Sequence, residues 1–286
     1  MIKVKEWFEY LCFYCLKVIC LFLPEVVIKF ILKIIVVIVK FTIYSRQKLM
    51  IKNLYLSFPE KNSKEILKIA NRVWYNIGLT FVLAFKYINN PKKILLKTKF
   101  VNKTNLKELC DNTIIFTAHI GNWEILAQRL VLEGYKIAAI VRELRNKIVN
   151  REVTKLREKL GGKVFYPHQL SSIINWLKNG GILYILPDQH IAEGSLRVDF
   201  LGRKAFTTPI ITILNKRLKS KIIPMFCIME GGKYSIYIEK PYLPKYSGDL
   251  KKDLEYNTLY MNKIIENYIR NYPDQWMWLH KRWKEK

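Results

Sequence analysis

The 286-residue sequence predicts an α/β fold: a central mixed, mostly parallel sheet flanked by helices, preceded by an N-terminal hydrophobic membrane-anchor helix. Two observations support this prediction. From Lys99 onward, short β-rich runs alternate with helical patterns, which is typical of a sheet covered by helices. The first forty-odd residues, in contrast, are largely apolar. We therefore divide the chain into an anchor, residues 1–44, and one α/β domain, residues 45–286.

The anchor segment is apolar but interrupted. Leu11–Leu23 contains one charge, Pro24-Glu25 breaks the run, and Val26–Ile43 continues it with three lysines. Neither half has the roughly 20 uninterrupted apolar residues of a spanning helix. The lysines recur at steps of four and seven and so share one helical face, where they can meet anionic headgroups (Lys29, Lys33 and Lys40). The alternative is a buried helix whose lysines extend toward solvent.

A helix is expected after a polar break over Arg46–Pro59. Asn62-Ser63 can cap this helix, Glu65 suits its first turn, and apolar residues at three- and four-residue steps extend it to about Lys86.

Six later runs predict strands: 113–118, 136–141, 163–166, 181–186, 221–229 and 233–239. The last two, joined through Glu230-Gly231-Gly232, predict an antiparallel hairpin at one end of the sheet. Helical patterns occupy 123–133, 146–160, 168–179, 207–218 and 252–270, and a Trp-rich tail follows at 273–283.

The excess of basic residues limits the classes of partner that the protein can bind. Lys and Arg number 49 against 23 Asp and Glu, for a net charge of +26. Nucleic acid, an anionic membrane surface and an acidic protein all fit such a charge, and an AT-rich genome also favours lysine. The basic residues are scattered and lack any nucleic-acid-binding motif, so nucleic acid is excluded first. The five cysteines suit a reducing compartment rather than a disulfide framework.

The residues most suggestive of chemistry are His119 and Glu124, in the sequence His-Ile-Gly-Asn-Trp-Glu. They follow a predicted buried strand, Gly121 permits a sharp turn, and Asn122 can cap the next helix. On a strand–turn–helix, Glu124 can bond one imidazole nitrogen while the other faces the carboxyl edge of the sheet, where α/β proteins usually bind ligands. An oriented histidine can remove a proton from a hydroxyl. The alternative is a structural capping pair.

Other chemistries lack their motifs. There is no Gly-x-Ser-x-Gly nucleophile elbow and no glycine-rich nucleotide loop. Cys12-x-x-Cys15 has no second pair to complete a metal site, and the remaining histidines are isolated. The motifs therefore indicate neither a metal site nor a nucleotide cofactor.

The hexapeptide resembles the signature of the lipid A biosynthesis (lauroyl/myristoyl) acyltransferases. The resemblance continues in the family's order over roughly residues 44–284. The matching segments are Asn53-Leu54 with Phe58-Pro59-Glu60, Val141-Arg142 with Asn146, Arg157, Leu186-Pro187-Asp188-Gln189, Val198–Gly202 with Ala205 and Thr207-Thr208, and Gln275–Trp283. Glu143 departs from the pattern, because the family usually has proline there.

The resemblance implies a glycerol-phosphate-acyltransferase-like fold and transfer of a fatty acyl chain to a hydroxyl of a lipid A precursor. The donor would be an acyl thioester, with acyl-carrier protein as the expected carrier, and the reaction would use neither a metal nor an organic cofactor. It also implies location at the cytoplasmic face of the inner membrane of a Gram-negative-type bacterium, where anionic lipid is a further partner. His119 would be the general base, oriented by Glu124.

Three further residues are candidates for binding substrate. Arg142 and Arg157 suit acceptor phosphates, because guanidinium binds phosphate bidentately, or are solvated charges at helix ends. Asp188, at a strand end, can orient a basic residue, bind sugar hydroxyls or cap a loop. The oxyanion donors are backbone N–H groups or Arg157. The tail tryptophans are expected to be core or interface anchors.

Two rival functions remain open at this point. One is an acyltransferase for another acceptor, such as a phosphoglycolipid or glycerol phosphate. The other is a non-catalytic membrane lipid-binding protein of the same fold.

Overall fold

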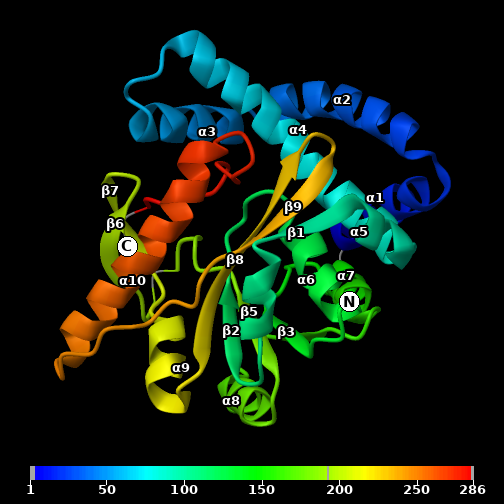
Figure 1. Ribbon diagram of the computed structural model, residues 1–286. Coiled ribbons are helices and arrows are strands. Elements are labelled where there is room, and N and C mark those ends of the chain that lie inside the picture. Colours follow the sequence, from blue (N-terminus) through cyan, green and yellow to red (C-terminus); the bar gives the residue numbers. More distant parts are fainter. Residues whose placement is uncertain (1–3, 192, 285–286) are drawn as a thin grey trace.

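A single seven-stranded sheet forms the centre of the computed structural model, which describes residues 4–191 and 193–284 (Figure 1). Its strand order is β1-β9-β8-β2-β5-β3-β4. All neighbouring strands are parallel except β8 and β9, so the prediction of a mixed, mostly parallel sheet with one hairpin is confirmed. The hairpin does not lie at one end of the sheet as predicted, because β1, a strand that we did not predict, pairs with the outer side of β9. The strands are β1 (Thr98–Val101), β2 (Thr113–Phe116), β3 (Ile137–Ile140), β4 (Lys163–Phe165), β5 (Ile182–Ile185), β8 (Lys221–Glu230) and β9 (Lys233–Ile238).

The central strands are buried along their whole length. Every residue of β2 and of β5 is buried, which explains why these segments are continuously apolar instead of alternating. Helices supply the cover: α6 packs on β3 and β8, α8 on β5, and α9 on β8. The helices after β1 are η1 (Lys103–Glu108), α6 (Trp123–Leu132), α7 (Lys147–Glu158), α8 (Leu170–Lys178), α9 (Ile210–Leu218) and α10 (Leu250–Asn271).

A long helix, α4 (Ser63–Ile88), crosses the top of the domain in Figure 1 and ends before the short helix α5 (Pro91–Lys97). Its predicted N-terminus is confirmed as a capping box, in which Asn62 and Glu65 exchange side-chain-to-backbone hydrogen bonds of 3.0 and 2.9 Å.

The predicted polar break over Arg46–Pro59 is wrong, because most of this segment is a helix, α3 (Tyr44–Ser57). Its polar residues lie largely on the solvent side. Met50, Leu54 and Ser57, spaced four and three apart, are buried on the other side. Asn53, on the buried side as well, donates to the carbonyl of Trp278 at 3.1 Å and ties the helix to the C-terminal tail.

Two short strands, which we did not predict from the sequence, form a separate antiparallel sheet. They are β6 (Leu196–Phe200) and β7 (Arg203–Thr207), and α10 packs against β6. Their buried residues alternate with more exposed ones, so no continuous apolar run marks these strands.

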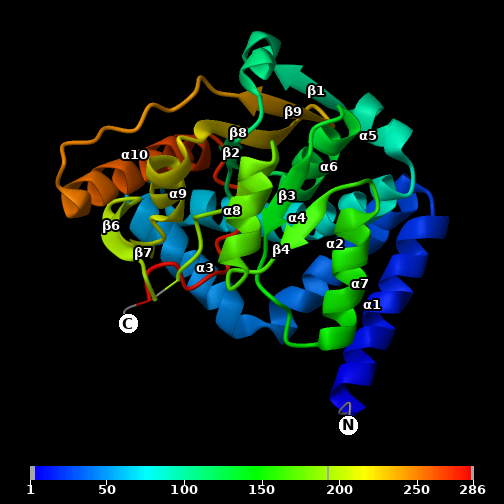
Figure 2. The same ribbon diagram turned by 90° about the horizontal axis from the view of Figure 1, so that it is seen from below.

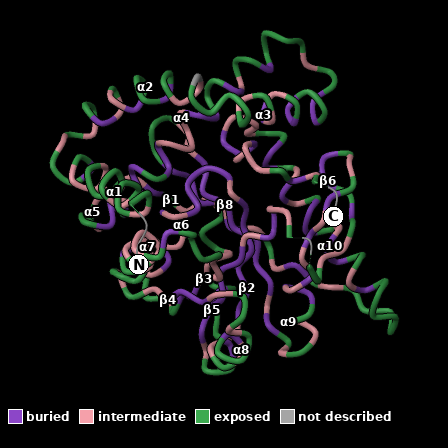
Figure 3. The backbone as a smooth tube through the Cα atoms, turned by 180° about the vertical axis from the view of Figure 1, so that it is seen from behind, coloured by how far each residue is buried: buried purple, intermediate pink, exposed green. Residues whose placement is uncertain are grey.

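The N-terminal segment is two helices, α1 (Val4–Phe22) and α2 (Glu25–Thr42), separated at Leu23-Pro24. The predicted anchor therefore does not form one continuous helix. In the part of the chain that the structure describes, we find no helix whose length and apolar character suffice to cross a bilayer. Both helices pack on α4, and α1 also runs beside α7 (Figure 2). Figure 3 shows that much of α1 and α2 is exposed, in contrast to the buried strands.

Candidate active site

The turn from β2 into α6 places His119 at the carboxyl edge of the sheet. Gly121 has a φ of +59°, and a Cβ atom there would lie 1.9 Å from the carbonyl oxygen of Cys227 on β8, so only glycine fits. Asn122 then caps α6 by accepting a hydrogen bond from the backbone of Ile125 at 3.0 Å. The strand–turn–helix predicted for this hexapeptide is confirmed.

Asp188 orients the imidazole of His119. The two residues follow β2 and β5, which are adjacent parallel strands, so both side chains reach the same edge. His119 Nδ1 lies 2.8 Å from Asp188 Oδ1, and the backbone N–H of His119 donates to Asp188 Oδ2 at 2.8 Å. The His119 side chain is 20% exposed and that of Asp188 only 1%. Because an ionised carboxylate can only accept, it favours the tautomer of His119 with the proton on Nδ1. In this tautomer Nε2 carries the lone pair and can accept a proton.

Trp276 completes the hydrogen bonding of Asp188. Its indole N–H donates to Asp188 Oδ2 at 2.8 Å, from the C-terminal tail. Burial alone would raise the pKa of Asp188, but the charge of His119 and the hydrogen bonds from His119 and Trp276 hold that pKa below its ordinary value. Asp188 is therefore an ionised acceptor at neutral pH.

Glu124 differs from our expectation. We expected it to bond the ring of His119, but it forms an ion pair with Arg157 of α7: Arg157 Nε donates to Glu124 Oε2 at 3.1 Å, and Nη2 donates to Oε1. Burial raises the pKa of Glu124, but the charge and hydrogen bonds of Arg157 and the charge of nearby His119 outweigh burial and lower it. Among the described residues, Arg157 Nη1 has no hydrogen bond. Asp188, separated from His119 by 69 residues in sequence, takes the position that we had assigned to Glu124.

The binding of sugar hydroxyls by Asp188 also disagrees with the structure. Its side chain is almost fully buried, and both oxygens are occupied by His119 and Trp276. Of the three possibilities that we considered, its contacts with His119 agree with orientation of a basic residue. Trp276, which we expected only to anchor the core, was missed as a neighbour of the site. The sole signal in the sequence was its place in the Trp-rich tail.

A cavity of about 500 Å³ opens in front of His119. His119, Glu124 and Arg157 all line it, and so does Arg142, which is exposed after β3. Trp123 packs edge-on against His119 with ring centroids 5.0 Å apart. The remaining lining is mostly aliphatic. The site thus combines one oriented base, one ion pair and the exposed cations Arg142 and Lys163 with an apolar wall. This arrangement suits a substrate that carries both a polar head and a hydrocarbon part.

Comparison with known proteins gives one consistent result. The sequence model described as "Bacterial lipid A biosynthesis acyltransferase" matches residues 1–285. The chain is 28% identical over 236 residues to "Lipid A biosynthesis acyltransferase 2" of Shigella flexneri, covering 80% of this chain and 74% of that one. It is 27% identical over 244 residues to "Lipid A biosynthesis myristoyltransferase" of Escherichia coli (strain K12), covering 83% and 74%. "Lipid A biosynthesis palmitoleoyltransferase" of the same strain is 22% identical over 244 residues, covering 84% and 79%.

Proposed function

Because the chain belongs to the bacterial lipid A biosynthesis acyltransferase family, we propose that it transfers a fatty acyl chain from an acyl-carrier-protein thioester to a hydroxyl of a lipid A precursor. The resemblance drawn from the sequence motifs is thereby confirmed at the level of the family. The observation that carries the reaction is the hydrogen bond between His119 and Asp188 at the mouth of the cavity.

His119 acts as the general base. With Nδ1–H held by Asp188, Nε2 accepts the proton of the acceptor hydroxyl while that oxygen attacks the thioester carbonyl. The tetrahedral intermediate then collapses, the carbon–sulfur bond breaks, and the imidazolium returns its proton to the leaving thiolate. The products are an ester and a free thiol, so the reaction needs no oxidant or reductant.

Arg157 and Arg142 bind the groups that carry negative charge during the reaction. Glu124 holds two of the three nitrogens of the Arg157 guanidinium, which fixes the orientation of the remaining one, Nη1. We assign this N–H to the developing oxyanion or to an acceptor phosphate. Arg142 is exposed at the rim of the same cavity and suits a phosphate. Glu124 thus acts through Arg157.

Membrane attachment is proposed through the outer faces of α1 and α2. These helices expose many large apolar side chains, which suits a position in the bilayer interface. The most exposed are Val4, Phe8, Phe22, Val26 and Phe30. The net charge of +26 favours anionic lipid and an acidic carrier protein. The cytoplasmic face of the inner membrane is the compartment where these partners meet.

The test is acyl transfer by the purified full chain. The protein, acyl-carrier thioesters and tetra- or penta-acylated lipid A precursors are incubated in mixed micelles, and products are detected by mass spectrometry. We expect a mass gain of one acyl chain, reduced about 10²–10⁴-fold or more in His119→Ala.

Two results would overturn the proposal. Addition of an acyl chain to a phosphoglycolipid or to glycerol phosphate, with none on the lipid A precursors, would replace the acceptor. Equal transfer by wild type and His119→Ala, with both shown to be folded, would remove His119 as the base.

A further inference from the structure

The loop after β3 and the helix α7 form a strongly basic surface beside the candidate active site. Residues 142–163 contain eight Lys or Arg and three Glu, a net charge of +5 over 22 residues. The whole chain carries +26 over 286 residues, so this stretch is about two and a half times as positive per residue. The proposed reaction uses only Arg142 and Arg157 of these cations, which leaves the others without an assigned role.

We define the α7 basic surface by five exposed cations (Arg142, Arg145, Lys147, Arg151 and Lys155). Lys147, Arg151 and Lys155 recur every four residues and therefore lie along one side of the helix. Among the described residues, only Lys155 of the five pairs with an acid, Glu152 at 3.2 Å. The other four present their full charge to solvent.

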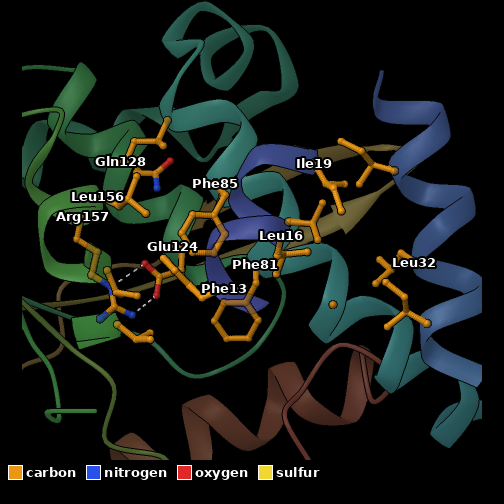
Figure 4. A pocket seen from close by; sticks show the side chains of 18 of the residues that line it. Phe13, Leu16, Ile19, Leu32, Phe81, Phe85, Glu124, Gln128, Leu156 and Arg157 are labelled. Carbon is orange, nitrogen blue, oxygen red and sulfur yellow. Dashed lines mark hydrogen bonds and ion pairs between the residues drawn. The ribbon is translucent and has the colours of Figure 1, made fainter. Parts of the chain in front are cut away.

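The opposite side of α7 is apolar and faces the interior. Val149, Val153 and Leu156 line an apolar cavity of about 470 Å³ that α1, α2, α4, α6 and α7 enclose. Figure 4 shows Leu156 and the Glu124–Arg157 ion pair at one end of that cavity. The helix is thus amphipathic, and its charged side is the one that can meet a partner.

The α7 basic surface adjoins the opening of the cavity that contains His119. Arg142 belongs to the surface and lines this cavity, and Lys163, at the start of β4, lines it as well. Both side chains are exposed, so the cavity reaches solvent at this point. A partner bound to the surface lies next to the opening.

We propose that the α7 basic surface docks the acidic carrier protein that delivers the acyl thioester. The proposal rests on the proposed acyl transfer. The cavity in front of His119 has a volume of about 500 Å³, which admits the thioester arm of a carrier but not its folded body. The body must therefore bind outside, close enough for its arm to enter. Opposite charges speed the encounter of the two proteins and fix their relative orientation.

Anionic lipid is the rival occupant, because its headgroups also attract basic side chains. A helix that lies in a bilayer interface buries large apolar side chains there. The exposed apolar residues of α1 and α2 meet this condition, whereas α7, which the structure describes in full, exposes no large apolar side chain. Figure 2 shows α7 beside α1, so a carrier on α7 lies at the margin of the membrane-facing surface. The composition of α7 therefore favours a soluble acidic protein.

The test reverses two charges of the surface that do not line the cavity, in the variant Lys147→Glu/Arg151→Glu. Steady-state kinetics are measured with an acyl-carrier thioester and with the same acyl group on pantetheine, which lacks the protein. We expect the KM for the carrier donor to rise about tenfold with little change in kcat, because two attractions become repulsions. The kinetics with acyl-pantetheine should equal those of wild type. Added salt should raise the wild-type KM for the carrier and reduce the difference between the proteins.

The matched control is Lys103→Glu/Lys107→Glu on η1. Both lysines are exposed and line neither cavity, and the change in net charge is the same, so the KM for the carrier should equal that of wild type. If the reversed variant does not fold, as judged by circular dichroism and thermal unfolding, Lys147→Ala/Arg151→Ala replaces it. That variant removes the attraction without adding repulsion, so we expect a smaller rise in KM, about threefold.

The outcomes separate the two proposals. If wild type transfers no acyl chain from either donor, the proposed function fails. If wild type is active but the folded variant keeps its KM for the carrier, the docking surface is overturned. Weaker binding to vesicles of phosphatidylethanolamine and phosphatidylglycerol, with the carrier KM unchanged, would assign the surface to lipid. Equal losses with the carrier and with acyl-pantetheine would show an effect on the cavity and overturn the docking surface as well.

Discussion

The buried carboxylate of Asp188 accepts three hydrogen bonds. Two come from His119, through Nδ1 and the backbone N–H, and one comes from Trp276. All three are donors, so the side chain must present acceptors only. An ionised carboxylate meets this requirement and an amide does not.

Asp188→Asn is therefore expected to slow acyl transfer strongly. The amide N–H₂ must face one of these donors, which either breaks a hydrogen bond or forces His119 into the tautomer with the proton on Nε2. We expect kcat to fall about 10²–10⁴-fold with a smaller change in the donor KM, measured by steady-state kinetics. Asp199→Asn, at a 53% exposed side chain on β6, is the control and should retain wild-type rates. Wild-type kcat in Asp188→Asn would contradict the dyad.

Arg157→Ala tests the second charged group at the site. It leaves Glu124, whose side chain is 13% exposed, without its partner, and we expect a loss of about 2–3 kcal/mol in the free energy of unfolding in urea. Adding Glu124→Gln removes the unpaired charge, so the double variant should be less destabilised than the sum of the single ones. If the losses in the free energy of unfolding add, the two side chains have no interaction energy in the folded protein.

The residues of the site were predictable from the sequence, but not all of their partners. Gly121 and Asn122 indicated a strand–turn–helix that carries His119, and motif order pointed to Asp188 and Arg157. The partner of His119 was assigned to Glu124 because the two are near in sequence. Asp188 replaces it because β5 pairs with β2, a neighbour relation that local patterns do not encode. Trp276 reaches Asp188 across 88 residues for the same reason.

At the scale of elements, the strands and helices that were predicted well are those fixed by burial. β2 and β5 are continuously apolar because helices cover both faces of the sheet, and the Asn62–Glu65 cap marks α4. The helix α3 and the strands β1, β6 and β7 were missed. Their stability depends on contacts with distant segments, the tail for α3 and α10 for β6. A short polar segment gives no local sign of such contacts.

The turn between β2 and α6 supplies a prediction at this scale. Gly121→Ala puts a methyl group 1.9 Å from the carbonyl oxygen of Cys227, in addition to the strain of a φ of +59°. Gly134→Ala is the matched control: its φ is +91°, but no atom lies within 4 Å of the added Cβ. We expect Gly134→Ala to lose about 1 kcal/mol in urea unfolding and Gly121→Ala clearly more, with loss of acyl transfer. Equal losses would mean that the backbone at Gly121 can move away from β8.

At the scale of the whole molecule, the C-terminal tail joins parts that lie far apart in the sequence. It accepts hydrogen bonds from α3 at the carbonyls of Trp278 and Leu279, and it reaches the site through Trp276. Arg282, fully buried, donates to the carbonyl of Phe206 and to the hydroxyl of Thr207. The tail therefore couples α3, the small sheet and the sheet edge that carries His119 into one folded unit. Protonation within the tail should then affect global stability.

His280 is the group in the tail where this can be measured. Burial, aided by the charges of His119 and Arg282 and opposed by that of Asp188, lowers the pKa of His280 to about 4, against an ordinary value of about 6.5. The neutral ring also accepts a hydrogen bond from the backbone N–H of His190 at 3.4 Å. Below pH 6.5 the unfolded chain binds a proton that the folded chain excludes. This contribution to stability is therefore complete above pH 6.5 and falls progressively toward pH 4, by at most about 1.4 kcal/mol per pH unit.

The measurement is urea unfolding of wild type and His280→Asn over this pH range. Asn Oδ1 can accept the same hydrogen bond without titrating, so the variant should lose less stability on acidification than wild type. Glu124 and Asp188, whose pKa values are held low by their partners, contribute stability that is lost at lower pH, and this loss is common to both proteins. The difference between the two curves isolates His280. Parallel curves from pH 7 to pH 4.5 would show that His280 is protonated equally in the folded and unfolded chains, and that the tail is open to water at this point.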